Sequence, residues 1–197
     1  SLFKAPMQAE VLKQIASKGS QGFYQSHITT DLVNSLQKLG GLHSIADFEN
    51  VKVQYVDPTY ADLKDGSTLI ELPPNGQGLT AIMMKKLMEF CNIERFGADS
   101  FERVHLEAEI AKIAYSARNN FIGDPDFLDV KQDIFLNDSY LERLSREISF
   151  GKVLTHNLGD DFFSRNKDTV LICAADNEGN AISLIFSTFH AFGSGLC

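Results

Sequence analysis

The densest hydrophobic pattern in the chain lies at residues 169–187, where two apolar runs flank a short polar stretch. Every residue of the first run after Thr169 is apolar: Val170, Ile172 and Ala174 on one face, and Leu171, Cys173 and Ala175 on the other. Strands with two apolar faces are typical of sheets covered on both sides. Residues 176–180 are rich in turn formers and include Gly179, where we expect a positive φ. The pattern predicts a β-hairpin that is buried on both faces.

Helical periodicity dominates the chain before this hairpin. The first predicted helix begins at Pro6 and ends at Gly19, and the second covers 22–39 and is ended by Gly40 and Gly41. A short helical turn is predicted at Asp47 and Phe48. Further helices are predicted at 79–91, 101–121 and 140–148. Asn137 or Asp138 is expected to cap the last of them, with Glu142 and Arg146 paired on its surface.

Two of these helices are expected to form the core. In the helix at 79–91, the stripe of Met83, Met84, Leu87 and Met88 is most simply explained as core packing. The helix at 101–121 is apolar over a wide arc that includes Val104, Ala108, Ile110, Ala111, Ile113, Ala114 and Tyr115. Arg103, Glu107 and Lys112 mark its expected wetter side. Both helices are therefore predicted to be well buried.

Short strands are predicted between the helices at 51–56 and 67–72, and we expect these two strands to pair. The second strand leads into the loop 73–78, which contains two prolines, Asn75, Gly76 and Gly78. Its glycines would let backbone amides approach an anion at the start of the next helix. The simpler interpretation is a tight connection from strand to helix. The loop is thus only a secondary candidate for substrate binding, through Asn75 and Gly76.

Composition narrows the classes of function. The chain has 197 residues, 44% of them hydrophobic, a formal charge of −8 and a pI near 5.1. These values favour a folded globular protein and argue against nucleic acid or an anionic membrane surface as its main partner. No apolar run approaches the length of a membrane span. The cysteines and histidines show no metal-ligand spacing, so we expect no metal and no cofactor.

The first residue of the hairpin is the main candidate for chemistry. Thr169 follows the polar residues 164–168 and begins a strand. A β-branched residue is ordinary in a strand and needs no functional explanation. Its hydroxyl has no base of its own. Cutting the bond between Asp168 and Thr169 would create an α-amino group, with a pKa of roughly 7.7–8.0, beside that hydroxyl. Thr169 is therefore either a strand residue or an N-terminal nucleophile.

A set of ordered motifs bears on this choice. They are Leu-Lys-Gln-Ile-Ala-Ser-Lys-Gly at 12–19, Gly-Phe-Tyr at 22–24, Leu-Gly-Gly at 39–41, Asp-Phe at 47–48, Leu-Pro-Pro-Asn-Gly-Gln-Gly at 72–78, Ala-Tyr-Ser-Ala-Arg at 114–118, Ile-Gly-Asp-Pro-Asp-Phe at 122–127, the run from Thr169 to Ser183, and Phe-Gly-Ser-Gly at 192–195. Together they resemble the γ-glutamyltranspeptidase family of N-terminal-nucleophile hydrolases. The resemblance covers nearly the whole chain, in the order of the family.

The resemblance implies an α+β fold, with a mostly helical region, short strands and a C-terminal hairpin that belongs to an αββα sandwich. It implies that residues 1–168 are the C-terminal part of a large subunit and 169–197 the start of a small one. Self-cleavage before Thr169 would then yield a transferase or hydrolase of γ-glutamyl amides such as glutathione, with Ser187 in a supporting role. Its partners would be that small-molecule substrate and the rest of both subunits. We expect this part alone to be inactive and residues 151–167 to be loose.

Two departures from the family pattern bear on the substrate. Val170 replaces a common threonine, and Phe189 stands where the glutathione-processing enzymes have an asparagine that binds the glutamyl backbone. A phenylalanine side chain cannot make that hydrogen bond. The alternatives are an acylase for glutaryl-like or poly-γ-glutamyl amides, and a non-catalytic member that acts as a binding or structural scaffold.

Overall fold

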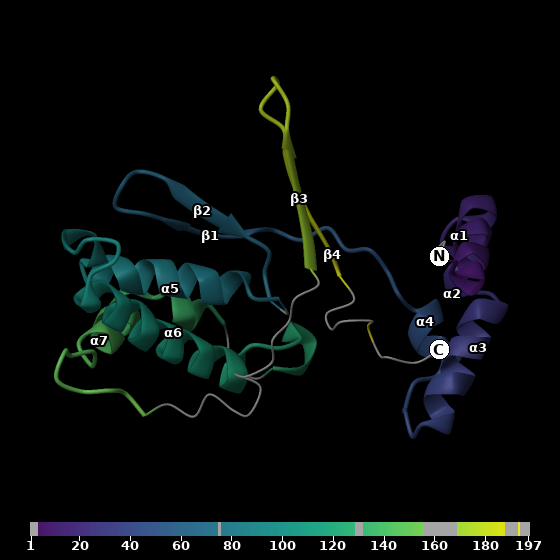
Figure 1. The fold of residues 1–197 in the computed structure, drawn as a ribbon, viewed down its shortest axis with the longest axis horizontal. Coiled ribbons are helices and arrows are strands. Elements are labelled where there is room, and N and C mark those ends of the chain that lie inside the picture. Colours follow the sequence, from purple (N-terminus) through teal and green to yellow (C-terminus); the bar gives the residue numbers. More distant parts are fainter. Residues whose placement is uncertain (1–3, 75, 129–131, 156–168, 188–192, 194–197) are drawn as a thin grey trace. The chain divides into compact units, whose positions relative to one another are not determined.

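The computed structural model describes residues 4–74, 76–128, 132–155, 169–187 and 193. The chain divides into two compact units, Ser1–Tyr55 and Val56–Cys197, and each is described by itself (Figure 1). The first unit is helical. The second holds a helical core, a short strand pair and the C-terminal hairpin.

The first unit contains four helices: α1 (Pro6–Lys18), α2 (Gln21–Tyr24), α3 (His27–Lys38) and α4 (Ile45–Glu49). The prediction of one helix over 22–39 is wrong, because Ser26 interrupts it. Ser26 has extended backbone angles, and its Oγ accepts a hydrogen bond from the Ile28 amide as the N-cap of α3. Gly22 packs closely on α1, since a Cβ there would lie 2.2 Å from the Gln14 carbonyl oxygen. This contact fixes the short α2 against α1.

The predicted stop of α3 is confirmed. Gly40 has a φ of 87°, its amide donates to the Gln37 carbonyl, and the Gly41 amide donates to the Leu36 carbonyl. These two bonds form a Schellman motif, which satisfies carbonyls that a helix end otherwise leaves unpaired. The expected helical turn at Asp47 is α4, where the Asp47 carboxylate accepts from the Ser44 amide.

The second unit opens with a strand pair, β1 (Thr59–Asp62) and β2 (Thr68–Glu71), in which Thr59 lies opposite Glu71. The strand predicted at 51–56 is wrong: those residues belong to no strand, and Val53 and Tyr55 are fully exposed. A tight turn decides the pairing. The Leu63 amide donates to the Ser67 carbonyl, with Gly66 at a φ of 85°, so the partner of β2 must end immediately before this turn.

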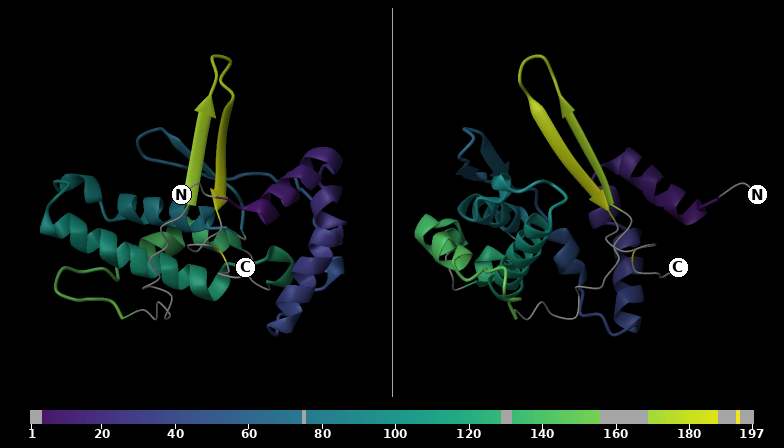
Figure 2. Two further views of the ribbon diagram at one scale, coloured as in Figure 1. Left: turned by 45° about the vertical axis from the view of Figure 1, so that its right-hand side comes forward. Right: turned by 60° about the vertical axis from the view of Figure 1, so that its left-hand side comes forward.

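The core of the second unit is built from α5 (Gly78–Phe90), α6 (Phe101–Phe121) and α7 (Asp138–Ser145), with short 3-10 helices η1 (Ile93–Arg95), η2 (Pro125–Phe127) and η3 (Gln132–Leu136). Helices α5 and α6 lie side by side (Figures 1 and 2). The methionine stripe is core as predicted, with Met83 and Leu87 buried and Met84 and Met88 packed against them. Asn137 caps α7 by accepting from the Tyr140 amide, at 3.0 Å.

The bounds predicted for α6 are confirmed, but its buried face differs from the prediction. Ile110, Ile113 and Ala114 are buried as predicted, but Val104 and Ala108 are exposed, and Leu106 and the charged residue Glu109 are buried in addition. The wide apolar arc of this helix allowed several orientations, and packing against α5 and residues 149–154 selected one of them. No helix among the described residues is long and apolar enough to span a bilayer.

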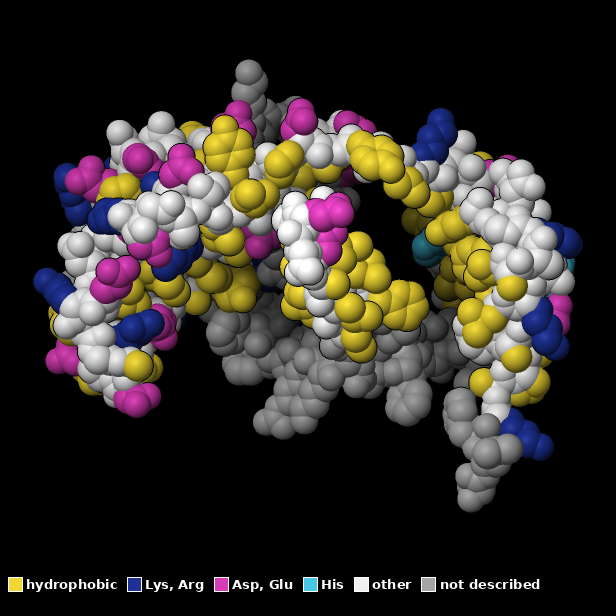
Figure 3. Space-filling model, turned by 90° about the horizontal axis from the view of Figure 1, so that it is seen from above, with side chains coloured by type: hydrophobic (Ala, Val, Ile, Leu, Met, Phe, Trp, Pro, Cys, Tyr) yellow, Lys and Arg dark blue, Asp and Glu magenta, His cyan; other side chains and the backbone are white. Residues whose placement is uncertain are grey.

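The C-terminal hairpin consists of β3 (Thr169–Ala175) and β4 (Ala181–Ser187), paired antiparallel, with Gly179 at a φ of 88° in its turn. The predicted strands and turn are confirmed. The predicted burial is not met, because the strand residues with described side chains are exposed on both faces. Hydrophobic side chains accordingly line the surface of the hairpin (Figure 3). A two-stranded ribbon has no further layer of its own to cover its faces.

Candidate active site

The candidate site begins at the open end of the hairpin. Thr169 is the first residue of β3 and pairs directly with Ser187, the last residue of β4. Directly opposed residues of an antiparallel pair lie on the same face of the sheet, with Cβ atoms about 4.5–5.5 Å apart. The register therefore brings together the predicted nucleophile position and its predicted supporting residue.

The turn at the other end of the hairpin fixes this register. The Asp176 carboxylate accepts hydrogen bonds from the Glu178 amide, and from both the backbone amide and the side-chain amide of Asn180, at 2.8–2.9 Å. The Asn180 bonds, followed by the backbone amides of the turn, hold the pKa of Asp176 below its ordinary value. A slip of one residue would move every side chain to the other face. The Asp176 turn thus determines that Thr169 meets Ser187.

Of the other predicted site residues, the structure describes only Gly76. Asp168, Phe189 and Asn75 lie outside the described residues. Gly76 belongs to the loop between β2 and α5, is exposed, and has no atom within 4 Å of where a Cβ would stand. Residues 151–167 are predicted to be loose, but Leu154, near the start of this stretch, is buried. Residues 156–167 lie outside the described ranges.

The loop from β2 to α5 has the form of a tight connection. A Cβ at Gly78 would lie 2.5 Å from the Leu72 carbonyl oxygen and 2.7 Å from Glu71 Cβ, so only glycine fits there. Arg118 Nη1 on α6 donates to Gln77 Oε1 at 3.0 Å and closes the loop onto that helix. These contacts support the simpler interpretation of the loop, as a structural connection.

Sequence reasoning missed a buried carboxylate on α6. The Glu109 side chain is 2% exposed, and its two oxygens accept from Lys112 Nζ at 2.6 Å and from the Leu154 amide at 2.7 Å. Burial raises the pKa of Glu109. The hydrogen bonds from Lys112 and Leu154, together with the nearby charges of Lys112 and His105, lower it by more, so the pKa lies below its ordinary value. The helical period offered a signal, because Glu107 falls on the predicted wetter side whereas Glu109 stands one turn from the apolar Leu106 and Ile113.

The described residues offer little for metal or thiol chemistry. Within the described ranges, no group of three or more His, Cys, Asp or Glu side chains is gathered around a point that would hold a metal. Burial raises the pKa of the Cys91 thiol, which therefore stays protonated at neutral pH. Cys173 lies on the strand that the sequence predicts to be buried on both faces, but it is exposed on the hairpin.

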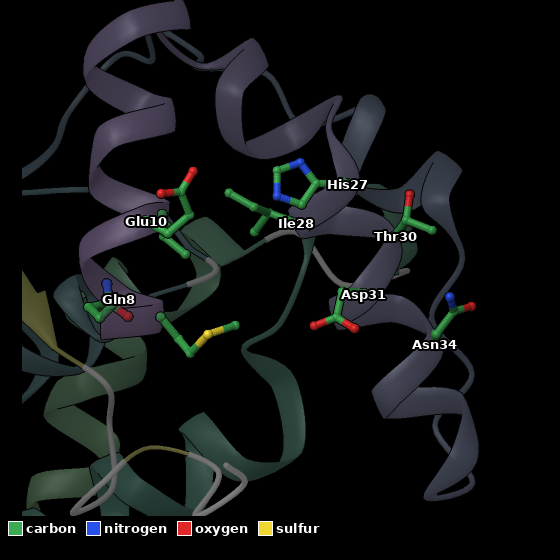
Figure 4. A pocket seen from close by; sticks show the side chains of 9 residues that line it. Gln8, Glu10, His27, Ile28, Thr30, Asp31 and Asn34 are labelled. Atoms are coloured by element: carbon green, nitrogen blue, oxygen red, sulfur yellow. The ribbon is translucent and has the colours of Figure 1, made fainter. Parts of the chain in front are cut away.

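A hollow of about 620 Å³ lies in the first unit between α1 and α3 (Figure 4). Glu10, His27 and Asp31 line it beside the half-buried Val11 and Ile28. The three polar side chains are exposed, and the lining includes no cysteine and no serine. The hollow therefore lacks the buried polar groups that fix a ligand in a built site, and the hairpin remains the candidate.

Comparison with known proteins decides the family. The sequence pattern of the family described as Gamma-glutamyltranspeptidase matches residues 1–197. The chain belongs to this family. It is 28% identical over 188 residues to a glutathione hydrolase-like proenzyme (YwrD) of Bacillus subtilis, covering 95% of this chain and 35% of that protein. It is 29% identical to an oxamate amidohydrolase proenzyme of Klebsiella pneumoniae, covering 100% of this chain and 36% of that protein.

Solved structures agree with this assignment. Cephalosporin acylase from Bacillus halodurans matches with a TM-score of 0.78 at 25% identity, covering 99% of this chain and 34% of that one. The γ-glutamyltranspeptidase of Helicobacter pylori matches with a TM-score of 0.69 at 25% identity, covering 84% of this chain and 49% of that one. The predicted α+β fold of N-terminal-nucleophile hydrolases is confirmed. The chain spans about a third of the length of the curated relatives it matches.

Proposed function

We propose that the full-length protein is a self-processing enzyme that hydrolyses or transfers γ-glutamyl or related acyl groups from amides such as glutathione. The observation that carries the proposal is the register of the hairpin, in which Thr169 begins β3 directly opposite Ser187. Relatives named glutathione hydrolase proenzymes support it, including one from Escherichia coli that is 25% identical over 95% of this chain.

Processing starts with Thr169 Oγ, which attacks the carbonyl carbon of Asp168. The peptide C–N bond breaks as the acyl group moves from nitrogen to oxygen, and the nitrogen becomes the free amine of Thr169. Water then hydrolyses the ester and leaves a carboxylate on Asp168. Ser187 assists from the paired position. This chemistry makes residues 1–168 the end of a large subunit and 169–197 the start of a small one.

The mature enzyme uses the same atoms on its substrate. The new amine has an ordinary pKa of roughly 7.7–8.0, so near neutral pH a fraction of it can take the proton of Thr169 Oγ. Oγ attacks the substrate amide to form an acyl-enzyme, the leaving amine takes the proton, and water or an acceptor amine then removes the acyl group. Backbone amides stabilise the oxyanion. By resemblance to the family, these amides and a carboxylate-binding arginine come from parts of the protein beyond this chain.

The exposed faces of the hairpin support the remaining subunit parts as partners. Leu171, Ile185 and Phe186 are each more than half exposed, although strands of this composition are typical of covered sheets. An isolated two-stranded hairpin is at best marginally stable in water. Further strands and helices of both subunits would cover these faces and complete the substrate pocket.

A second substrate class is favoured by Phe189, which cannot bind a glutamyl backbone as asparagine does. The oxamate amidohydrolase and the cephalosporin acylase support an amide of another acid, because their names show that acyl groups differ among proteins similar to this chain. Glutaryl-like and poly-γ-glutamyl amides are the candidates. Thr169 and the acyl-enzyme chemistry would be the same for either class.

The test is the intact mass of the full-length protein beside its Thr169→Ala and Thr169→Ser variants. We expect the wild type to split at the Asp168–Thr169 bond, the serine variant to split more slowly, and the alanine variant to remain whole, since it has no hydroxyl. A screen of γ-glutamyl, glutaryl and oxamate amides would then identify the acyl group. A wild type that remains whole would contradict the proposal and favour the non-catalytic scaffold.

A further inference from the structure

Residues 149–154, here called the clamped segment, lie upstream of the proposed cleavage site and are hydrogen-bonded to α6 near both ends. The segment follows α7, makes an isolated bridge between Ser149 and Lys152, and ends on the buried Leu154, which is 8% exposed. Only residues 155–168 separate it from Thr169. What holds this segment therefore holds the upstream side of the bond to be cut.

Two side chains of α6 hold the backbone of the clamped segment. Glu109 accepts a hydrogen bond from the Leu154 amide at 2.7 Å, and His105 Nε2 donates to the Ser149 carbonyl at 3.0 Å. His105 and Glu109 stand one helical turn apart on α6, so together they grip both ends of the segment. The ring of Phe150 also packs against His105, at 5.6 Å between centroids, and against Phe96, at 5.8 Å.

The hydrogen bond that the Leu154 amide donates to Glu109 is the stronger of the two contacts. A carboxylate that is 2% exposed needs hydrogen-bond donors, because an ionised group loses its hydration on burial. Lys112 supplies one donor and the Leu154 amide supplies the other. Releasing the segment would leave one carboxylate oxygen without its donor until water reached it. Charge-assisted hydrogen bonds of this kind are about twice as strong as neutral ones.

We propose that Glu109 and His105 form a clamp that keeps the upstream chain on α6 through self-cleavage. The clamp confines the released tail to residues 155–168 and leaves residues 149–154 docked in the mature enzyme. The inference rests on the proposed function, since it needs the cut before Thr169. Glu109 and His105 act here as positioning residues, because their contacts are to the clamped segment.

The clamp also shortens the loop that contains the bond to be cut. With the clamp, the loop has roughly 14 residues, and without it the next residue packed on the core is Ile148, which gives roughly 20. Loop-closure probability falls with about the 3/2 power of loop length, so losing the clamp should slow self-cleavage by about twofold at most. The larger effect is on the tail after the cut.

Trypsin gives the sharpest test, because Lys152 lies inside the clamped segment while Arg165 and Lys167 lie in the tail. In the processed full-length protein we expect trypsin to trim the tail and to spare the bond after Lys152. Glu109→Gln should speed cleavage after Lys152 by roughly five- to tenfold, the effect expected when the charge-assisted hydrogen bond from the Leu154 amide becomes a neutral one. Glu107→Gln is the matched control: Glu107 lies on the same helix, is half-exposed and paired to Arg103, and its change should leave this rate unchanged.

A second variant guards against a folding defect. His105→Phe keeps an aromatic ring beside Phe150 but loses the bond to the Ser149 carbonyl, and it should also expose the bond after Lys152. Hydrogen exchange of the Leu154 amide, measured in the uncut Thr169→Ala protein, reports the clamp without any cleavage. Protection of this amide that Glu109→Gln lowers, and Glu107→Gln does not, supports the clamp.

The outcomes separate the two proposals. A processed wild type in which Glu109→Gln leaves both the Lys152 cleavage rate and the Leu154 exchange unchanged overturns the clamp alone. A wild type that remains whole overturns the proposed function, and the released tail with it.

Discussion

The buried pair of Glu109 and Lys112 allows a quantitative prediction about stability. The carboxylate is 2% exposed and lies 2.6 Å from Lys112 Nζ, while the lysine side chain is 24% exposed. The perturbations are Glu109→Gln, Lys112→Met and the double variant. Each single change leaves the other member of the pair without its charged partner, whereas the double variant removes both charges. The Gln variant keeps nearly the same volume, but the charged acceptor of the Leu154 amide becomes a neutral one, which makes a weaker hydrogen bond.

Removing one partner of a fully buried ion pair costs about 3–5 kcal/mol, and a hydrogen bond to a charged group is worth about 1.5–3 kcal/mol. Because Lys112 is partly exposed and can be hydrated, the lower figure applies to Glu109→Gln, about 2 kcal/mol. Lys112→Met leaves a buried carboxylate with one donor and should cost about 2–3 kcal/mol. The double variant should be less destabilised than the sum of the single variants by about 1–1.5 kcal/mol.

The assay is denaturant unfolding of the four proteins, followed by helical circular dichroism, with hydrogen exchange at the Leu154 amide as a local check. The pKa of Glu109 is lowered in the folded state. Its contribution to the free energy of unfolding is therefore complete above the unfolded carboxyl pKa and is lost as the pH falls through the lowered folded value. The gap between wild type and Glu109→Gln should be largest near neutral pH and shrink under acid conditions.

Strict additivity of the two single variants would refute this reasoning, as would a cost below about 0.5 kcal/mol for each, the range of ordinary surface changes. A gap that widened as the pH fell would contradict the sign of the pKa shift. Glu107→Gln on the same helix serves as control, because the half-exposed i,i+4 pair of Glu107 with Arg103 is worth only about 0.3–0.5 kcal/mol.

Two further predictions concern the loop before α5 and the turn of the hairpin. Gly78→Ala should destabilise the second unit by about 1–3 kcal/mol, because the added Cβ would lie 2.5 Å from the Leu72 carbonyl oxygen. Gly76→Ala should be nearly neutral, because a Cβ there has no atom within 4 Å. Thermal unfolding compares the two variants, and equal midpoints would contradict the close approach at Gly78. Asp176→Ala should slow self-cleavage of the full-length protein by loosening the register of Thr169 against Ser187. Intact mass over time measures this rate, with Glu178→Ala as control at the same turn, and equal rates for the two variants would argue against control by the turn.

Local physical chemistry made several features readable from the sequence alone. The hairpin could be predicted because its turn chemistry, including Gly179, lies between two apolar runs. The bounds of α6 and the Schellman stop at Gly40 follow from periodicity and from residues only a few positions apart. The order of the motifs identified the family. Each of these signals is contained within a short stretch of chain or in the succession of such stretches.

Tertiary structure decided the rest, because the relevant partners are distant in sequence. The apolar alternation at 51–56 gave no sign that the Leu63 turn would pair β2 with Thr59–Asp62 instead. The helical period places Glu107 on the wetter side of α6, but the donor that satisfies the buried Glu109 is the Leu154 amide, 45 positions away, which no local pattern reveals. The pattern of apolar side chains in the sequence indicates which faces of a helix or strand must be buried. Which distant segment covers each one is set by the packing of the whole chain.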